Sequence, residues 1–452
     1  MITRRTALAG LIASGLAHPA QAAVPLNSHF IALLGRGDAA YDAAIAALQR
    51  HVQAGEGTGL IHGLILTLRY PAWRDRPILN LLSLITGDDH PDWFHWMLWQ
   101  EARPAITAHD GYRDLKRHIF YGFDPRFADF INDDHLDMSR IRFEEVTWGG
   151  VKTDGIPGLT HPKMIPAAKA DFMVGSDAVL GVSVNGDTRA YPLRILAWHE
   201  MLNDTIGGVP VALPYCTLCN SGILFETDIG LDAPVAFGTS GLLYRSNKLM
   251  WDSATRSLWN QFTGEPVIGP LADSGLRLTP HPVVVEPWVR WLARNPDSTV
   301  LSLDTGFIRN YGSGHFYDRY IRSDDLIFPA RADESVIAKK DIVFGIRTFG
   351  GAKAWPLTAF EGGRVLNDSV GALNVVLIGD RLGDTVRAYD RGSLDFASKD
   401  GALHASGTAW QVTEAALIAP DGTRLPRIAG RTSYWFAWNN YEGAGSELFR
   451  EG

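Results

Sequence analysis

The sequence has very little cysteine, with two residues among 452. A secreted scaffold held together by several disulfides is therefore excluded, because such a scaffold needs several pairs of cysteines. An excess of positive charge is also lacking: 42 basic and 50 acidic residues give a net charge of −8, and no basic stripe is present. Nucleic-acid binding, which depends on basic patches, is therefore not expected.

Long apolar runs are absent as well, since none reaches the roughly 20 residues of a membrane-spanning helix. Apolar residues make up 46% of the chain and charged residues 20%, which is typical of a folded globular protein and not of a disordered one. What the chain does contain is 46 glycines and 14 tryptophans. This composition favours a turn-rich β protein with aromatic packing.

Residues 1–22 predict an export signal. Basic residues in Met1–Arg5 precede the apolar stretch Thr6–Ala17, and Ala20–Ala22 fits the small-x-small rule for cleavage. The pair Arg4-Arg5 resembles a twin-arginine signal, which exports proteins that are already folded. An ordinary secretory signal is the alternative. Cleavage near Ala22 predicts a periplasmic protein in either case.

Residues 23–145 predict a helical domain. The segment Asp38–Ala54 is rich in helix formers and has apolar residues at helical spacing, and prolines separate the periodic segments that follow it. The histidines of this region lack metal-like spacing. We interpret the domain as a cap or as a docking module for a protein partner.

An internal repeat organises the rest of the chain. Residues 180–226 align with residues 344–390 at a constant offset of 164 and without a gap. Identical pairs include Gly181 with Gly345 and Asn203 with Asn367. The sequence therefore predicts an α+β fold: an N-terminal helical bundle followed by two duplicated, mostly β halves packed together, at 146–302 and 303–452.

The chemistry-bearing residues occur in the first half only. Residues kept in both halves serve the shared scaffold, whereas residues found in one half are better candidates for a site. Asp380 and Gly383 stand where the first half has Cys216 and Cys219. The other unmatched residues of the first half are His199, Glu200 and Tyr215, whose counterparts are Gly363, Arg364 and Gly379.

The repeat places Cys216 and Cys219 at the turn of a β-hairpin. A thioredoxin-like dithiol lies at a strand-to-helix junction, whereas a hairpin turn is typical of a metal knuckle. Two cysteines cannot complete a four-ligand structural zinc site, and three protein ligands with an open position are the catalytic pattern. We predict His199 as the third ligand and Met250 as an added soft ligand. This set suits copper or zinc.

The function predicted from these residues is a periplasmic metal-binding protein, a metalloenzyme acting on a small-molecule substrate. Glu200 and Tyr215 are the predicted catalytic residues, with Glu200 acting as a general base or as a group that supports the metal ligands. Two alternatives stay open. One is a metal-free dithiol–disulfide oxidoreductase, and the other is a binding or assembly module with a structural Cys216–Cys219 disulfide.

Three segments carry a family resemblance. Trp148–Pro157, Tyr215–Asn220 and Ser257–Gly264 resemble the bacterial exported family called domain of unknown function 3179. The resemblance extends from about Val146 to the C-terminus and leaves the helical domain outside. It implies no activity, because the family is named for lacking one. It adds Tyr244 and Asp252 to Met250 as residues that would line the site.

Overall fold

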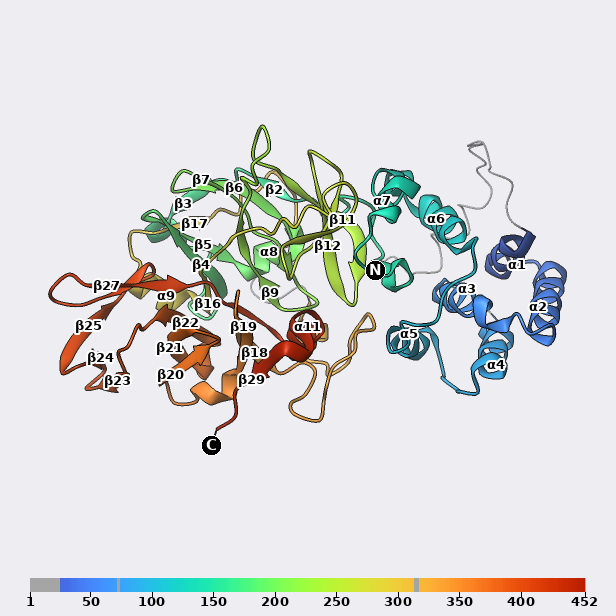
Figure 1. Cartoon of the computed structure of the whole chain (residues 1–452). Helices are drawn as coiled ribbons and strands as arrows, with labels where there is room; N and C mark the ends of the chain where they lie inside the picture. Colours follow the sequence, from blue (N-terminus) through green and yellow to red (C-terminus); the bar gives the residue numbers. More distant parts are fainter. Residues whose placement is uncertain (1–24, 71–73, 313–316, 452) are drawn as a thin grey trace. The chain divides into compact units, whose positions relative to one another are not determined.

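The computed structural model describes residues 25–70, 74–312 and 317–451 (Figure 1). The predicted export signal lies outside these residues. The chain divides into two compact units, residues 1–153 and 154–452. Val146–Trp148, which the repeat boundaries assign to the first half, form strand β1 and are grouped with the first unit.

Apart from strand β1, the regular structure described in the first unit is helical, as the sequence predicts. Apolar residues of each longer helix face its neighbours, such as Ile78 and Leu82 of α4, which are fully buried. A glycine in left-handed conformation, Gly87 with φ of 76°, ends α4. The helices are α1 Pro25–Leu34, α2 Asp38–Gln53, α3 Gly57–Arg69, α4 Asp75–Thr86, α5 Trp93–Glu101, α6 Tyr112–Phe123 and α7 Asp133–Asp137.

The second unit is built mainly of antiparallel strands. Its first part contains β2 Leu159–Thr160, β3 Met164–Pro166, β4 Ala178–Val184, β5 Asp187–Pro192, α8 Leu193–His199, β6 Leu202–Ile206, β7 Val209–Ala212, β8 Tyr215–Cys216, β9 Ser221–Gly222, β10 Leu224–Glu226, β11 Phe237–Tyr244, β12 Asn247–Asp252, β13 Leu258–Asn260, β14 Glu265–Ile268, β15 Pro280–His281, β16 Val283–Pro287, α9 Trp288–Arg294 and β17 Thr299–Leu301.

A connecting segment with α10 Asp318–Ile321 leads to the second part. That part contains β18 Ile342–Thr348, β19 Gly351–Pro356, β20 Arg364–Val370, β21 Leu373–Asp380, β22 Thr385–Asp390, β23 Phe396–Lys399, β24 Ala402–Ala405, β25 Thr408–Val412, β26 Ala416–Ile418, β27 Arg424–Ile428, β28 Arg431–Tyr434, α11 Trp435–Glu442 and β29 Ser446–Leu448.

Two sheets of this unit have the same plan. The strand order β16-β4-β5-β17 in one matches β28-β18-β19-β29 in the other. In both, the first three strands are antiparallel neighbours and the fourth runs parallel to the third. Green and yellow mark the first sheet in Figure 1, and orange and red mark the second. Strands β4 and β18 begin 164 residues apart, at the offset found in the sequence.

Corresponding side chains make corresponding contacts in these two sheets. Trp291 of α9 lies so close to Gly181 that an added Cβ would be 2.0 Å from its ring, and Trp438 of α11 stands at the same distance from Gly345. Only glycine fits below either indole. Gly181 and Gly345, which are kept in both halves, therefore serve the packing of a helix on a sheet.

The asparagines kept in both halves hold corresponding loops. Asn203 Nδ2 donates to Phe237 O at 2.9 Å and its Oδ1 accepts from Phe237 N at 2.8 Å. Asn367 makes the same pair of bonds with Phe396, each at 2.8 Å. A side-chain amide that bonds both backbone groups of one distant residue acts as scaffold, in agreement with the sequence interpretation.

Candidate functional site

The two cysteines lie on the hairpin turn that the sequence predicts. Strands β8 and β9 pair antiparallel, with Cys216 opposite Ser221. The turn closes with Cys219 N donating to Cys216 O at 3.2 Å, and Asn220 takes the left-handed conformation with φ of 50°. Because one turn carries both residues, their side chains converge on the same side.

The two sulfur atoms are 3.2 Å apart, within hydrogen-bonding distance, and both thiols are free. Cys216 is 2% exposed and Cys219 is fully buried. Asn247 Nδ2 donates to the sulfur of Cys219 at 3.2 Å and to Gln261 Oε1 at 2.7 Å. Strand β12 therefore fixes the second sulfur through Asn247.

A buried ion pair lies beside the dithiol. Lys248 Nζ is 3.2 Å from Glu200 Oε2 and donates to Glu200 O at 2.5 Å. Thr217, inside the cysteine turn, donates to Glu200 Oε1 at 3.1 Å. Glu200 follows the end of α8 in the left-handed conformation, with φ of 55°, and Lys248 follows Asn247 in β12. Sequence analysis singled out Glu200 and missed Lys248.

These surroundings shift the pKa values of the two thiols in opposite directions. Burial alone raises the pKa of a thiol. At Cys216, burial and the Glu200 carboxylate raise the pKa of the thiol. They are outweighed by the hydrogen bond with Cys219, by the backbone N–H of Lys248 and by its ammonium charge, so the pKa is lowered. At Cys219, burial and the charge of Cys216 raise the pKa well above its usual value. Of the two thiols, Cys216 therefore loses its proton first.

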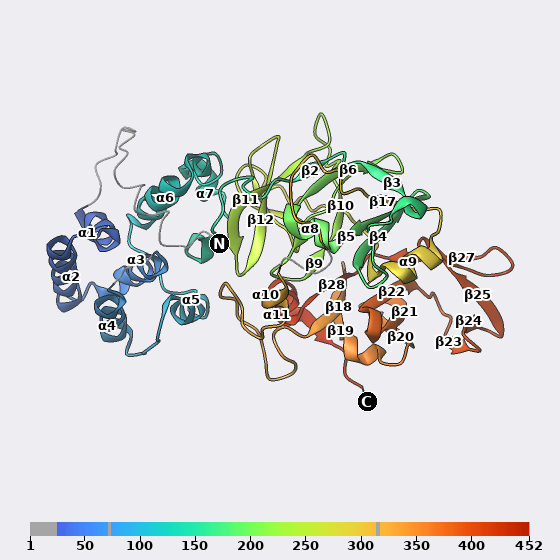
Figure 2. The same cartoon turned by 180° about the vertical axis from the view of Figure 1, so that it is seen from behind.

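Tyrosines from the connecting segment and the second half cover the turn. Tyr320 of α10 donates its hydroxyl to Leu218 O at 2.7 Å, and Tyr434 N at the end of β28 donates to Cys219 O at 2.9 Å. Figure 2 shows α10 and β28 next to β9, and β28 contacts β9 directly. Burial raises the pKa of several tyrosines near the turn, and negative charge on the cysteines raises it further. These residues are Tyr215, Tyr317, Tyr320, Tyr434 and Tyr441.

His199, the predicted third metal ligand, is fully buried with both ring nitrogens engaged. Its Nδ1 is 2.7 Å from Pro157 O, and its Nε2 is 2.5 Å from the hydroxyl of Tyr311. A carbonyl only accepts, so Nδ1 carries the proton and Nε2 accepts from Tyr311. Burial lowers the pKa of His199, which keeps the ring neutral.

Two further predicted residues, Met250 and Tyr215, lie in apolar surroundings. Met250 is fully buried in a cluster with Met201 and Trp259. Tyr215 packs into the core beneath β4 and α8, and its hydroxyl is 3.3 Å from Asn220 Oδ1. Within residues 25–70, 74–312 and 317–451, no group of three or more His, Cys, Asp or Glu side chains is placed to hold a metal ion. The structure therefore assembles Cys216, Cys219 and Glu200, but not the set with His199.

One feature of the sequence could have indicated that Lys248 and Asn247 belong to the site. They precede the apolar run Leu249-Met250-Trp251 in a strand that is buried on both faces, with Lys248 only 5% exposed. A lysine at such a position must be paired, because lysine is almost never fully buried alone. The tyrosines of the cover gave no signal, since they come from distant parts of the chain.

The comparisons with known proteins agree with these motifs. A family model described as "Protein of unknown function (DUF3179)" matches residues 153–445. The chain belongs to the DUF3179 family. The match includes the dithiol turn, its ion pair and the tyrosines that cover it, and it confirms the resemblance found in the sequence. No curated protein and no solved structure matches the chain.

The helices of this DUF3179 protein were compared with the requirements for a membrane-spanning segment. Within the described residues, none combines the length and the apolar character required to cross a membrane. The helical domain at 25–145 lies outside the family match.

Proposed function

We propose that Cys216 and Cys219 form a dithiol–disulfide redox centre, with Cys216 as the attacking thiolate and Cys219 as the resolving thiol. The observation that carries this proposal is the pair of sulfurs at 3.2 Å, of which one has a lowered pKa and the other a raised pKa. Thiolate is the nucleophilic form of cysteine, so the asymmetry assigns the order of attack. Lys248 stabilises the thiolate.

The proposed reaction has two steps. The Cys216 thiolate attacks one sulfur of a small disulfide, forms a mixed disulfide and releases the other half as a thiolate. Cys219 then loses its proton and attacks the sulfur of Cys216, which releases the second half and leaves a Cys216–Cys219 disulfide. The substrate disulfide gains two electrons and the dithiol loses two. Closing the internal bond requires the sulfurs to approach by about 1.2 Å.

In this reaction Glu200, which accepts a hydrogen bond from Thr217 in the cysteine turn, takes the proton of Cys219 in the second step. The burial of both sulfurs means that the cover must open before a substrate disulfide reaches Cys216. Opening therefore limits the rate with large substrates, and the proposal favours small ones. The predicted export signal favours a periplasmic location for this reaction.

The test is trapping of the mixed disulfide in the exported protein. In Cys219→Ser, glutathione disulfide should form a stable adduct on Cys216, detected by mass spectrometry. In Cys216→Ser, the remaining thiol should stay unmodified at neutral pH, because burial, the largest cause of its raised pKa, is retained. The unmodified chain should titrate as one two-electron couple in glutathione buffers. Modification of Cys219 first, or the absence of a redox couple, would overturn the assignment.

A transition-metal site at the same sulfurs is the second candidate. The convergence of two buried sulfurs favours it, and copper or zinc suits thiolate ligands. It requires His199 to leave Tyr311, and the adjacent Lys248 charge opposes a bound cation. Elemental analysis of protein from the periplasm decides between the two: one ion per chain that is lost in Cys216→Ser favours the metal, and metal-free protein with a titratable couple favours the dithiol.

A further inference from the structure

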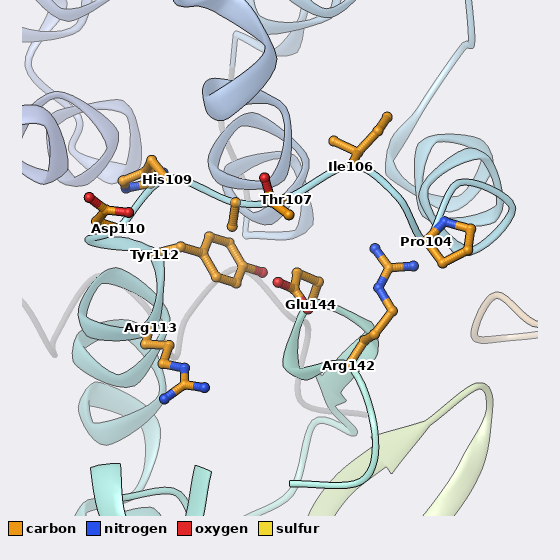
Figure 3. Close-up of a pocket in the computed structure, with 10 residues that line it drawn as sticks. Pro104, Ile106, Thr107, His109, Asp110, Tyr112, Arg113, Arg142 and Glu144 are labelled. Carbon is orange, nitrogen blue, oxygen red and sulfur yellow. The ribbon is translucent and has the colours of Figure 1, made fainter. Parts of the chain in front are cut away.

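The helical unit contains a cavity of about 380 Å³, independent of the dithiol. Its walls come from the loop before α6, the first residues of α6 and the segment that precedes β1 (Figure 3). This volume lies within the usual range for sites that bind small molecules. Pro104, Ile106 and Ala108 give it an apolar side.

The cavity has one carboxylate without a partner. Glu144 lines it, and its carboxylate forms no hydrogen bond or ion pair with the residues that the structure describes. Asp110 adds a second negative charge at the exposed rim. Figure 3 shows the Tyr112 ring and the Glu144 carboxylate pointing toward one another across the cavity. A positively charged group is the natural occupant of this end.

The cationic residues of the wall are already neutralised. Arg113 pairs with Asp137 at 2.5 Å, and Arg142 Nη1 pairs with Glu145 at 2.9 Å. Burial lowers the pKa of His109, which keeps that ring neutral. The charge left over in the cavity is therefore negative, and an anionic ligand is disfavoured.

One buried donor is left unused. Nη2 of Arg142 is buried and has no hydrogen-bond partner among the described residues. A buried donor without a partner is unfavourable, so a ligand oxygen that reaches Nη2 would satisfy it. Figure 3 shows the Arg142 guanidinium beside Glu144, on the Pro104 side.

We propose that this cavity binds a small organic amine whose ammonium group lies next to a neutral oxygen acceptor, as in an aminoacyl amide or the first residue of a peptide. The ammonium pairs with Glu144, the oxygen accepts from Arg142 Nη2, and an apolar substituent contacts Pro104 and Ile106. The ammonium meets a carboxylate that has no hydrogen bond or ion pair among the described residues, and the oxygen meets the unpaired Nη2.

The experiment is calorimetric titration of the whole chain with leucinamide as the probe. Isoamylamine lacks the oxygen and N-acetylleucinamide lacks the cation. We expect leucinamide to bind at least tenfold more tightly than isoamylamine, and N-acetylleucinamide to show no binding. Free leucine, whose carboxylate adds a negative charge, should bind more weakly than leucinamide. No binding of leucinamide at millimolar concentration, or equal binding of the acetylated probe, overturns the proposal.

Variants separate the two contacts. Glu144→Gln should abolish the preference for the charged probes, and Arg142→Lys, which keeps the charge next to Glu145, should bring leucinamide down to the affinity of isoamylamine. Arg113→Gln is the matched control: it lies in the same wall but is paired with Asp137, so it should leave binding unchanged. Unchanged affinity in a folded Glu144→Gln protein also overturns the proposal.

Discussion

The two corresponding turns of the second unit, at 216–219 and 380–383, lie on matching scaffold but in opposite environments. In the first, the side chains of Cys216 and Cys219 are buried under the tyrosine cover. In the second, Leu382 is 88% exposed and Asp380 pairs with Arg290 of the other half at 2.5 Å. Two sheets of the same plan thus carry corresponding turns, and only the turn with the cysteines is covered.

The cover changes the interpretation of the second half. It lacks the cysteines, yet Tyr434 and Tyr441 come from it and contribute to the surroundings of the sulfurs. The half without a reactive group therefore takes part in the site of the other. The following experiments test the contacts between the two halves, the packing that they have in common and the environment of the cysteines.

The largest effect is expected where the halves are joined. Glu414 and Arg387 of the second half and Glu286 of the first form a network, in which Arg387 Nη2 is 2.7 Å from Glu414 and also contacts Glu286. Arg427 completes it by contacting Glu414 and donating to Val283 O at 2.9 Å. Glu414→Gln leaves buried charge unpaired and should lower the free energy of unfolding by about 3–5 kcal/mol in urea denaturation.

The pH dependence of stability checks the same network. The two arginines outweigh burial and lower the pKa of Glu414 to about 2. Its contribution is therefore complete above the unfolded value near 4.5 and is lost as the pH falls toward 2. Glu414→Gln should lack this loss. Asp304→Asn removes the exposed pair with Lys163 and should change stability by no more than about 0.5 kcal/mol; an equal loss in both variants would contradict the assignment.

The shared scaffold predicts equal effects at matching glycines. Gly181→Ala and Gly345→Ala each place a methyl group against a tryptophan ring, and each should destabilise the protein by about 1–3 kcal/mol. Thermal unfolding of the two variants measures this. Gly445→Ala, where a Cβ has open space, should be neutral. A clear difference between the first two variants would show that the halves pack differently.

The charge beside the first turn should control the reactivity of Cys216. In Lys248→Met the pKa of Cys216 should rise, and alkylation at pH 7 should slow by about tenfold for each unit of that rise, because only the thiolate reacts. Alkylation rates measured from about pH 5 to pH 10, the range in which thiols titrate, give the shift in the pKa of Cys216. Lys248→Met with Glu200→Gln removes both charges and should recover part of the rate. An unchanged profile in the single variant would exclude Lys248 from the site.

The smallest effect concerns the cover itself. Tyr320→Phe removes the hydrogen bond to Leu218 O and should cost about 1 kcal/mol, while native-state alkylation of Cys216 becomes faster. Tyr311→Phe is the matched control: it removes hydrogen bonds to His199 and Thr305, away from the turn, and should cost a similar energy without faster alkylation. Equal acceleration in both would mean that general loosening, and not the cover, exposes the sulfurs.

Much of the fold could be predicted because its signals are local or repeated. Helical periodicity gave the segment Asp38–Ala54, and the constant offset gave two sheets of one plan. The hairpin turn at Cys216 and Cys219 followed from the same alignment. The cover could not be predicted, because Tyr320 and Tyr434 lie about 100 and 215 residues beyond the turn and such contacts leave no local pattern.

The predicted metal ligands show why neighbours in sequence can separate in space. His199 is the last residue of α8, and Glu200 follows in the left-handed conformation. This reversal directs Glu200 to the hairpin while His199 bonds Pro157 and Tyr311. The sequence indicates that a helix ends here, but not the backbone conformation that decides which of the two side chains reaches the sulfurs.

The bond from Tyr434 N to Cys219 O has a consequence for biosynthesis. Cys219 is translated 215 residues before Tyr434, so the ribosome adds nearly half of the chain before this bond can form. Throughout that interval the cover over the two sulfurs is incomplete in the nascent polypeptide. Only the finished polypeptide can therefore bury the two thiols completely.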